Sequence, residues 1–376
     1  MQQYSHFMRI LFCVARGLYY ICANLIPLRT NTYYQMKRLI CAVLCGASVI
    51  AACAQDELVR LKMQTRVDYQ REYVDGDAVH DNSGFKGKYF MLLLDGKIND
   101  HFSYAYRQRL NKGCSGESFF DATDWAYLKY QPDRHWSFSV GKEPVAVGGY
   151  EYDANPVDVY YASEYWNNIP CFQLGATVAY TTKSGNDKIA VQCSQSPFVA
   201  KASDMYAYSL MWYGSHGCLS TLYSANMVEY MRGRYISYLS FGHKLALGCV
   251  TVEADFMNRA ASGQTFLFAD CSAIVNVAYR PTDKLNVFGK VTYDVNSTSK
   301  TADYCVMPGT EMTQVGGGVE FRPHKSVRLH AAYSRCFGTN TNEAGTLKPG
   351  RDWLDVGFTW NINMLTLRNP WRKGND

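Results

Sequence analysis

Charged side chains recur at every second position in several stretches of this sequence. A β-strand places alternate residues on opposite faces, so this spacing gathers charge on one face and apolar residues on the other. Charges that line a water-filled space attract and steer ions. The basic residues that the pattern places on such an inner wall are Arg60, Lys62, Arg66, Arg107, Arg109, Lys290, Arg322 and Arg328.

A second charged group lies in the long connection 143–170 and beside it, and it is mostly acidic. Against the basic wall, such a segment would narrow the interior and set up a transverse electric field that orients dipolar solutes and weakly selects ions. We therefore predict a constriction loop here. Its charged residues are Lys142, Glu143, Glu151, Asp153, Asp158 and Glu164.

Other chemistry has little support in the sequence, which contains no Gly-x-Ser-x-Gly, His-Glu-x-x-His or P-loop motif. His330 and Ser334 could serve a lipid hydrolase, but the alternation places them on the inner face. Asp153, Asn155 and Asp158 offer alternate oxygens for calcium without the spacing of an EF-hand loop. The cysteines form no Cys-x-x-Cys pair. We predict neither enzymatic activity nor a cofactor or metal site.

The alternation of apolar and polar residues predicts that the elements that position these charges are β-strands almost throughout. Between residues 352 and 363, for example, Leu354, Val356 and Phe358 alternate with polar residues. The predicted strands are sixteen in number and span 58–70, 86–97, 101–110, 121–131, 135–142, 171–182, 187–195, 206–213, 218–226, 234–243, 248–257, 270–280, 285–295, 310–322, 326–335 and 352–363.

Short and long connections alternate along this series of strands. The long ones are 71–85, 111–120, 143–170, 296–309 and 336–351. Outer-membrane barrels have short turns at one end and long loops at the other. We therefore predict an all-β fold, a transmembrane antiparallel up-and-down β-barrel of about sixteen strands, with a wet lumen and an apolar outer wall. A soluble β-sandwich or propeller is the alternative. Aromatic residues make up 14% of the chain, which suits a protein at a lipid boundary.

The N-terminal region has the features of an export signal. Met36, Lys37 and Arg38 precede an apolar run that ends in an Ala-x-Ala site. We predict an upstream extension at 1–35, a signal peptide at 36–54, the barrel at 55–364 and a tail at 365–376. A lipoprotein signal with lipidated Cys53 is the alternative. Residues 1–54 carry five bases and no acid, so the net charge of +5 leaves 33 bases and 33 acids beyond them. This balance gives no support to nucleic-acid binding.

Three stretches carry a family resemblance: residues 106–112, residues 121–127, and the Gly-Lys-x-Pro element at 141–144 that continues to Asp153. In them the sequence resembles the phosphate-selective porin O and P family, in the form found in Bacteroidetes-like bacteria. The resemblance implies a homotrimeric, sixteen-stranded channel in the outer membrane of a Gram-negative bacterium. Such a channel contacts outer-membrane lipid and passes small hydrophilic solutes or anions by passive diffusion.

One departure from that family concerns selectivity. Phosphate selectivity there depends on basic residues in the lumen and in the third loop, whereas 143–170 is acidic here. We therefore favour a general porin with weak ion preference over an anion- or phosphate-selective one. A barrel that acts in adhesion or binding through its long loops, 71–85 and 296–309, is a further alternative.

Overall fold

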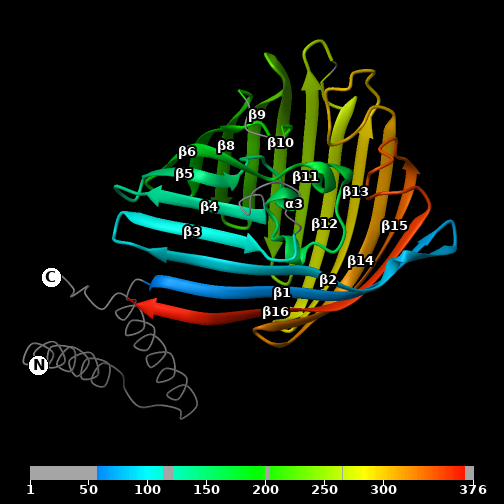
Figure 1. Ribbon diagram of the computed structural model, residues 1–376, viewed down its shortest axis with the longest axis horizontal. Coiled ribbons are helices and arrows are strands. Elements are labelled where there is room, and N and C mark those ends of the chain that lie inside the picture. The colour runs from blue at the N-terminus through cyan, green and yellow to red at the C-terminus, as the bar shows by residue number, and fades with distance from the viewer. Residues whose placement is uncertain (1–56, 113–121, 200–203, 265, 369–376) are drawn as a thin grey trace, which may run out of the picture. The chain divides into compact units, whose positions relative to one another are not determined.

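The computed structural model describes residues 57–112, 122–199, 204–264 and 266–368, and the structural statements below concern these residues. Within them the strands form one closed antiparallel barrel, in which each strand pairs with its neighbours in sequence and β16 closes on β1 (Figure 1). The strands are β1 (Glu57–Val74), β2 (Asp77–Lys97), β3 (Phe102–Arg109), β4 (Thr123–Tyr130), β5 (Trp136–Pro144), β6 (Phe172–Thr181), β7 (Asp187–Gln195), β8 (Tyr206–His216), β9 (Leu219–Met231), β10 (Arg234–Leu247), β11 (Val250–Ala261), β12 (Asp270–Thr282), β13 (Leu285–Asn296), β14 (Thr310–His324), β15 (Val327–Thr339) and β16 (Arg351–Arg368). The predicted fold class and strand number are confirmed.

The two faces of the strands differ as the alternation predicts. On β15, Leu329 and Tyr333 are exposed on the outside, whereas His330 and Ser334 are buried inside the barrel. The same inversion recurs around the wall, so large apolar side chains cover the outer surface and polar ones face the interior. A soluble β-sandwich would bury its apolar face. The observed arrangement is the one that a bilayer requires.

The two ends of the barrel differ in their connections. At the end where β1 begins and β16 finishes, all connections are short, such as 217–218 and 283–284. At the opposite end lie the long ones, including 145–171 and 297–309. In porins the short turns face the periplasm and the long loops face outward, so we call the second end the outer end.

One predicted long loop is absent, because the segment 71–85 continues the first two strands as a hairpin. β1 and β2 pair as far as Val74 and Asp77, and the turn consists of Asp75 and Gly76. Both turn residues have positive φ, 52° and 90°, as a type I′ hairpin turn requires. At the other terminus, β16 runs to Arg368, four residues beyond the predicted end of the barrel.

The predicted extension 1–35, the signal peptide 36–54 with Cys53, and the end of the tail lie outside the described residues. No helix in the described ranges has the length and apolar character needed to cross a membrane.

The connection between β5 and β6, residues 145–171, contains short helical segments: α3 (Tyr150–Asp153), the 3-10 turn η2 (Pro156–Asp158) and α4 (Glu164–Asn168). We call residues 145–171 the constriction loop. It contains many buried side chains, among them Val145, Val147, Val157 and Tyr165. A loop on the outer rim would be exposed, so this burial shows that it folds inside the barrel.

Candidate functional site

Two wall carboxylates hold the constriction loop at the start of its helical segments. Asp255 on β11 accepts hydrogen bonds from the backbone N–H groups of Tyr150 and Glu151, each at 2.8 Å. Asp294 on β13 accepts from the N–H of Glu164 at 2.8 Å. The first N–H groups of a helix have no partner within it, so buried carboxylates at these positions both satisfy the backbone and fix the loop in place.

Basic wall residues hold the middle of the loop. Arg66 on β1 donates to the carbonyl oxygen of Val159 at 2.7 Å, and Arg328 on β15 donates to that of Val157 at 2.9 Å. Arg328 also forms an ion pair with Asp158 of the loop. These arginines are buried and paired, so they position the loop rather than meet solute in open water.

Lys290 on β13 makes the same kind of contact. Its Nζ lies 2.6 Å from Glu151 Oε1 and donates to the Tyr161 carbonyl oxygen at 2.9 Å. Glu151 also accepts a hydrogen bond from the Ser163 N–H at 3.0 Å. One wall lysine thus neutralises a loop carboxylate and ties together two parts of the loop.

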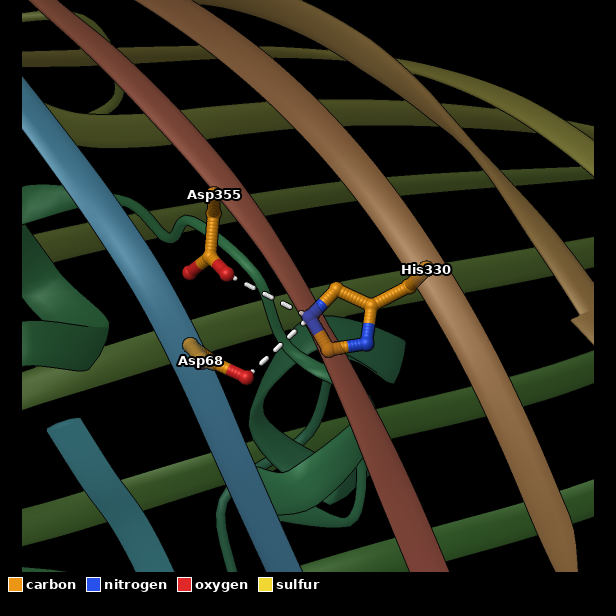
Figure 2. A group of neighbouring side chains, drawn as sticks. All are labelled: Asp68, His330 and Asp355. Atoms are coloured by element: carbon orange, nitrogen blue, oxygen red, sulfur yellow. Dashed lines mark hydrogen bonds and ion pairs between the residues drawn. The ribbon is translucent and has the colours of Figure 1, made fainter. Parts of the chain in front are cut away.

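Arg66 belongs to a buried cluster that spans three strands, and Figure 2 shows the other three members, Asp68, His330 and Asp355. His330 Nε2 lies 3.2 Å from Asp68 Oδ1 and 3.3 Å from Asp355 Oδ1. The Arg66 guanidinium lies 2.8 Å from Asp68 and 3.1 Å from Asp355. The three ligand-type atoms fall within 4.8 Å of one another, as metal ligands do. Because the Arg66 guanidinium and the imidazole already contact both carboxylates, these carboxylates have partners within the chain itself. The cluster fastens the loop through Arg66.

Tyr160 is the aromatic contact of the constriction loop with this wall. Its ring lies 4.5 Å from the His330 ring and 5.4 Å from the Phe288 ring, and the Arg66 guanidinium carbon lies 4.6 Å from its centroid. Its hydroxyl donates to Glu320 at 2.8 Å. Burial raises the pKa of Tyr160 well above its usual value, so the phenol stays neutral and keeps donating.

The constriction loop separates two cavities in the lumen. The smaller has a volume of about 260 Å³ and lies between the loop and strands β10–β15, the side to which the loop is fastened. We call it the latched side. Its lining holds five bases (Lys244, Arg280, Lys290, Arg322 and Arg328) and five acids (Glu151, Asp158, Glu253, Asp255 and Glu320), so its formal charge is zero.

The larger cavity has a volume of about 730 Å³ and lies between the loop and strands β2–β8. We call it the open side. Its lining holds five bases (Arg107, Arg109, Lys112, Lys129 and Lys188) and three acids (Asp124, Glu143 and Asp153), which gives a formal charge of 5 − 3 = +2.

The charged residues of the open side differ in whether they form close ion pairs with one another. Asp124 lies 2.8 Å from Arg107 and 3.2 Å from Arg109, and Arg107 also stacks on Trp125 at 3.6 Å. Asp153 belongs to the constriction loop and is exposed, near Lys188 across the cavity. Although its side chain reaches the cavity, the surrounding barrel partly desolvates the carboxyl group and raises the pKa of Asp153, while Lys188 and Lys244 act in the opposite direction.

The predicted basic wall is divided between different regions of the barrel. Arg66, Lys290 and Arg328 hold the constriction loop, and we call these three residues the latch. Arg322 lies 2.8 Å from Glu320 in the lining of the latched side. Arg107 and Arg109 line the open side. Arg60 lies near the short-turn end and donates to Asp95 at 3.0 Å. Lys62 follows it at the next inward position of β1.

The predicted acidic loop is divided as well. Lys142 and Glu143 lie on β5, ahead of the constriction loop, and the alternation turns Lys142 to the outer face with Val140. Glu143 lines the open side. Glu164 is fully buried and accepts from Asn168 at 2.7 Å, and burial raises its pKa. Of the six predicted residues, Asp153 and Glu143 line the open side, and Glu151 and Asp158 are paired with wall bases.

Three lysines of the open side were not among the predicted site residues: Lys112, Lys129 and Lys188. A signal for Lys129 was available, since it alternates with Leu128 and Tyr130, which are exposed on the outside. Lys188 is the second residue of the predicted strand 187–195, and the phase of a strand is hardest to assign at its ends.

A closed sixteen-strand barrel with an apolar outer wall, a polar lumen and an inward-folded third loop defines an outer-membrane porin, a passive channel rather than an enzyme. Its place is the outer membrane of a Gram-negative bacterium. Over residues 59–217 the chain matches the family model of the phosphate-selective porin O and P, so the resemblance seen in the sequence motifs is confirmed. No curated protein matches the chain.

Solved porins share the fold at low sequence identity. An anion-selective porin from Comamonas acidovorans is 9% identical with a TM-score of 0.59, covering 81% of this chain and 99% of its own. The outer-membrane channel DcaP of Acinetobacter baumannii is 12% identical with a TM-score of 0.58, covering 81% and 97%. The trimer form of OmpT from Vibrio cholerae is 15% identical with a TM-score of 0.55, covering 81% and 99%.

Proposed function

We propose that this porin is a general diffusion channel with a weak preference for anions, and that solutes pass along the open side. The observation that carries the proposal is the composition of the open-side lining, with five bases against three acids. Asp124 forms ion pairs with Arg107 and Arg109. The charged groups that can interact with passing ions are therefore chiefly Lys129, Lys188 and Asp153. A small excess of positive charge favours anions without excluding cations.

The size of the open side supports general diffusion. A volume of about 730 Å³ far exceeds the ~30 Å³ that one water occupies in the liquid, so ions can keep hydrating water as they pass. Wide, hydrated pores discriminate by charge rather than by close coordination.

The transverse field expected from an acidic loop and a basic wall is reduced in this arrangement. Glu151 and Asp158 are neutralised by Lys290 and Arg328, and Glu164 is buried away from the pore. What remains is Asp153 opposite Lys188. We therefore infer a weak field confined to the open side.

Phosphate selectivity is the second candidate, favoured by the description of the matching family. Selective capture of a multivalent anion calls for several uncompensated bases that converge on one point. The constriction loop, 145–171, contains no Lys or Arg, and Arg107 and Arg109 share Asp124. These features favour the general channel.

We further propose that the chain is exported through residues 36–54 and assembles as a homotrimer in contact with outer-membrane lipid. The related OmpT structure is described as a trimer form. An apolar outer wall offers surface both to lipid and to neighbouring barrels.

The test is the reversal potential of single channels in a planar bilayer across a potassium chloride gradient. We expect a modest potential of the sign that indicates anion preference, and little effect of added phosphate. Cation selectivity, or near-ideal anion selectivity with block by low concentrations of phosphate, would contradict the proposal.

A further inference from the structure

A third cavity lies on the outer side of the constriction loop. It has a volume of about 120 Å³ and is bounded by the loop, by β1, β2, β14 and β16, and by Thr346 and Leu347 of the connection between β15 and β16. We call it the outer pocket. Its lining includes the bases Arg66, Lys88 and Arg351 and no acid.

The three bases of the outer pocket differ in how their charge is compensated. Arg66 is paired with Asp68 and Asp355. Arg351 lies 3.2 Å from Glu72 and donates to the Thr346 carbonyl oxygen at 2.6 Å. Among the described residues, no carboxylate lies within ion-pair distance of Lys88, which leaves its positive charge available to a ligand.

Aromatic rings form much of the remaining lining. Lys88 Nζ lies 5.4 Å from the Trp353 ring centroid, and the Arg351 guanidinium carbon lies 4.1 Å from the same ring. Tyr89, Tyr160, Tyr161 and Trp166 complete the aromatic set. Two cations beside one indole repel each other, so an anion that approached them would relieve that repulsion.

The volume restricts what can enter the outer pocket. A cavity of ~150 Å³ lined by apolar side chains can hold a benzene molecule, and the outer pocket is slightly smaller at about 120 Å³. A small planar group that bears one negative charge matches this lining, and a group larger than benzene must leave part of its body at the mouth of the pocket. A multiply charged anion would find only one uncompensated base.

We propose that the outer pocket is a binding subsite for small planar organic carboxylates, which are held before they pass the constriction. The carboxylate would meet Lys88, and the flat body would lie against Trp353 and Trp166. The proposal rests on the proposed diffusion function, since a solute must reach the pocket through the water-filled outer mouth. It adds a preferred class of solute to a channel of otherwise weak selectivity.

The experiment adds benzoate to the outer side of single channels in potassium chloride and measures interruptions of the current. We expect concentration-dependent interruptions. Benzyl alcohol should be at least about tenfold weaker, because it loses the charge-assisted contact. Phosphate should also be at least about tenfold weaker, because it has no flat body to lie against the indole rings. Equal potency of benzyl alcohol or of phosphate would overturn the proposal.

Variants locate the effect. Lys88→Met should weaken the benzoate effect about tenfold or more, and Lys88→Arg should retain most of it. The control is Lys348→Met, which removes the same charge from an exposed position of the connection between β15 and β16. Unchanged sensitivity in Lys88→Met, or equal losses in Lys348→Met, would refute the assignment of Lys88.

The current in potassium chloride alone separates this proposal from the diffusion function and reports whether each variant folds. A protein that conducts normally yet ignores benzoate would overturn the subsite and leave the channel intact. A wild-type protein that does not conduct would overturn both. Trp353→Leu provides a second test that leaves the charge in place, and an unaltered benzoate effect there would rule out the aromatic wall.

Discussion

The linings of the latched side and the open side of the lumen both contain basic and acidic residues, but the basic residues have different roles on the two sides. Lys290 and Arg328 on the latched side, and Arg66 on β1, are buried and paired with carboxylates or carbonyl oxygens of the constriction loop. On the open side Lys129 and Lys188 line a cavity in which bases outnumber acids. The position of its partners decides whether a lumen base holds the loop or selects the solute.

This difference follows from the energetics of burial. A buried charge is costly unless it is paired, so the latched arginines and their carboxylates depend on one another. A charge beside water costs little and contributes little to stability, but its field extends into the pore. Substitutions of the buried bases that hold the constriction loop should therefore affect folding most, and those on the open side should affect conduction.

The largest expected effect comes from Arg66→Met. It leaves Asp68 and Asp355 buried with only His330 between them and removes the bond to the Val159 carbonyl oxygen. Breaking a buried pair costs about 3–5 kcal/mol. We expect a loss of that size in the free energy of unfolding in urea, measured by the electrophoretic shift of the folded barrel, together with a noisier open-channel current.

Two variants serve as controls for the latch. Arg66→Met combined with Asp355→Asn should recover part of the lost stability, since one unpaired carboxylate is then neutral. Arg322→Met breaks a half-exposed pair with Glu320 and should cost much less. Equal losses in Arg66→Met and Arg322→Met would show that burial does not determine how much an ion pair of the lumen contributes to stability.

The next effect in size concerns ion selectivity. Replacing both Lys129 and Lys188 by Glu changes the open-side lining from five bases and three acids to three bases and five acids. The formal charge passes from +2 to −2, so we expect the reversal potential to change sign. Lys244→Gln on the latched side, where Lys244 lies 2.9 Å from Glu253, should change it little. An equal shift in both variants would remove the distinction between the cavities.

Gly318→Ala tests the packing beneath the latch. A Cβ at Gly318 would lie 2.5 Å from the Ala331 carbonyl oxygen and 2.7 Å from Phe288 Cζ, and Phe288 packs on Tyr160 of the constriction loop. Overpacking of this kind costs ~1–3 kcal/mol, which thermal unfolding would detect. Gly289→Ala is the matched control, because its Cβ would have no neighbour closer than 3.8 Å. Similar costs at both positions would argue against the contact.

The smallest effect is a dependence of selectivity on pH. Partial desolvation inside the barrel raises the pKa of Asp153, so as pH falls this carboxyl becomes neutral before an ordinary aspartate does. The formal charge of the open side then rises by one, and anion preference should increase in the reversal potential between neutral and acidic pH. Asp153→Asn should remove this part of the change, whereas Glu343→Gln on an exposed outer connection should not. An identical pH profile in Asp153→Asn would exclude Asp153 as the cause.

The strands were predictable because each side chain faces either lipid or the lumen. Leu329 is exposed on the outside of the barrel, and its neighbour His330 is buried inside. Apolar and polar residues therefore alternate along the strand, and this alternation can be recognised in the sequence. The segment 77–85 was harder, because it is polar on both faces where the hairpin extends beyond the barrel wall. Only the Asp75–Gly76 pair indicated a hairpin there.

The site was less predictable, because charge pairing depends on strands far apart in sequence. Arg328 and Asp158 are 170 residues apart, and Arg66 and Asp355 are 289 apart. The alternation placed both arginines on the inner wall, but no local pattern says that a loop will cover them. Lys142 and Glu143 are adjacent on β5 and therefore face opposite sides of the wall. Glu143 lines the open side, whereas the alternation places Lys142 on the outer face.

The most direct test of a conducting open side is chemical modification of single cysteines during current recording. The variants are Lys129→Cys on the open side and Asn276→Cys on the latched side, both with Cys171→Ser, since Cys171 lines the open side. The Cys171→Ser protein treated with the same bulky methanethiosulfonate reagent gives the baseline. We expect a stepwise loss of current at Lys129→Cys and little change at Asn276→Cys. Block at Asn276→Cys with no effect at Lys129→Cys would contradict the division of the lumen into a latched and an open side.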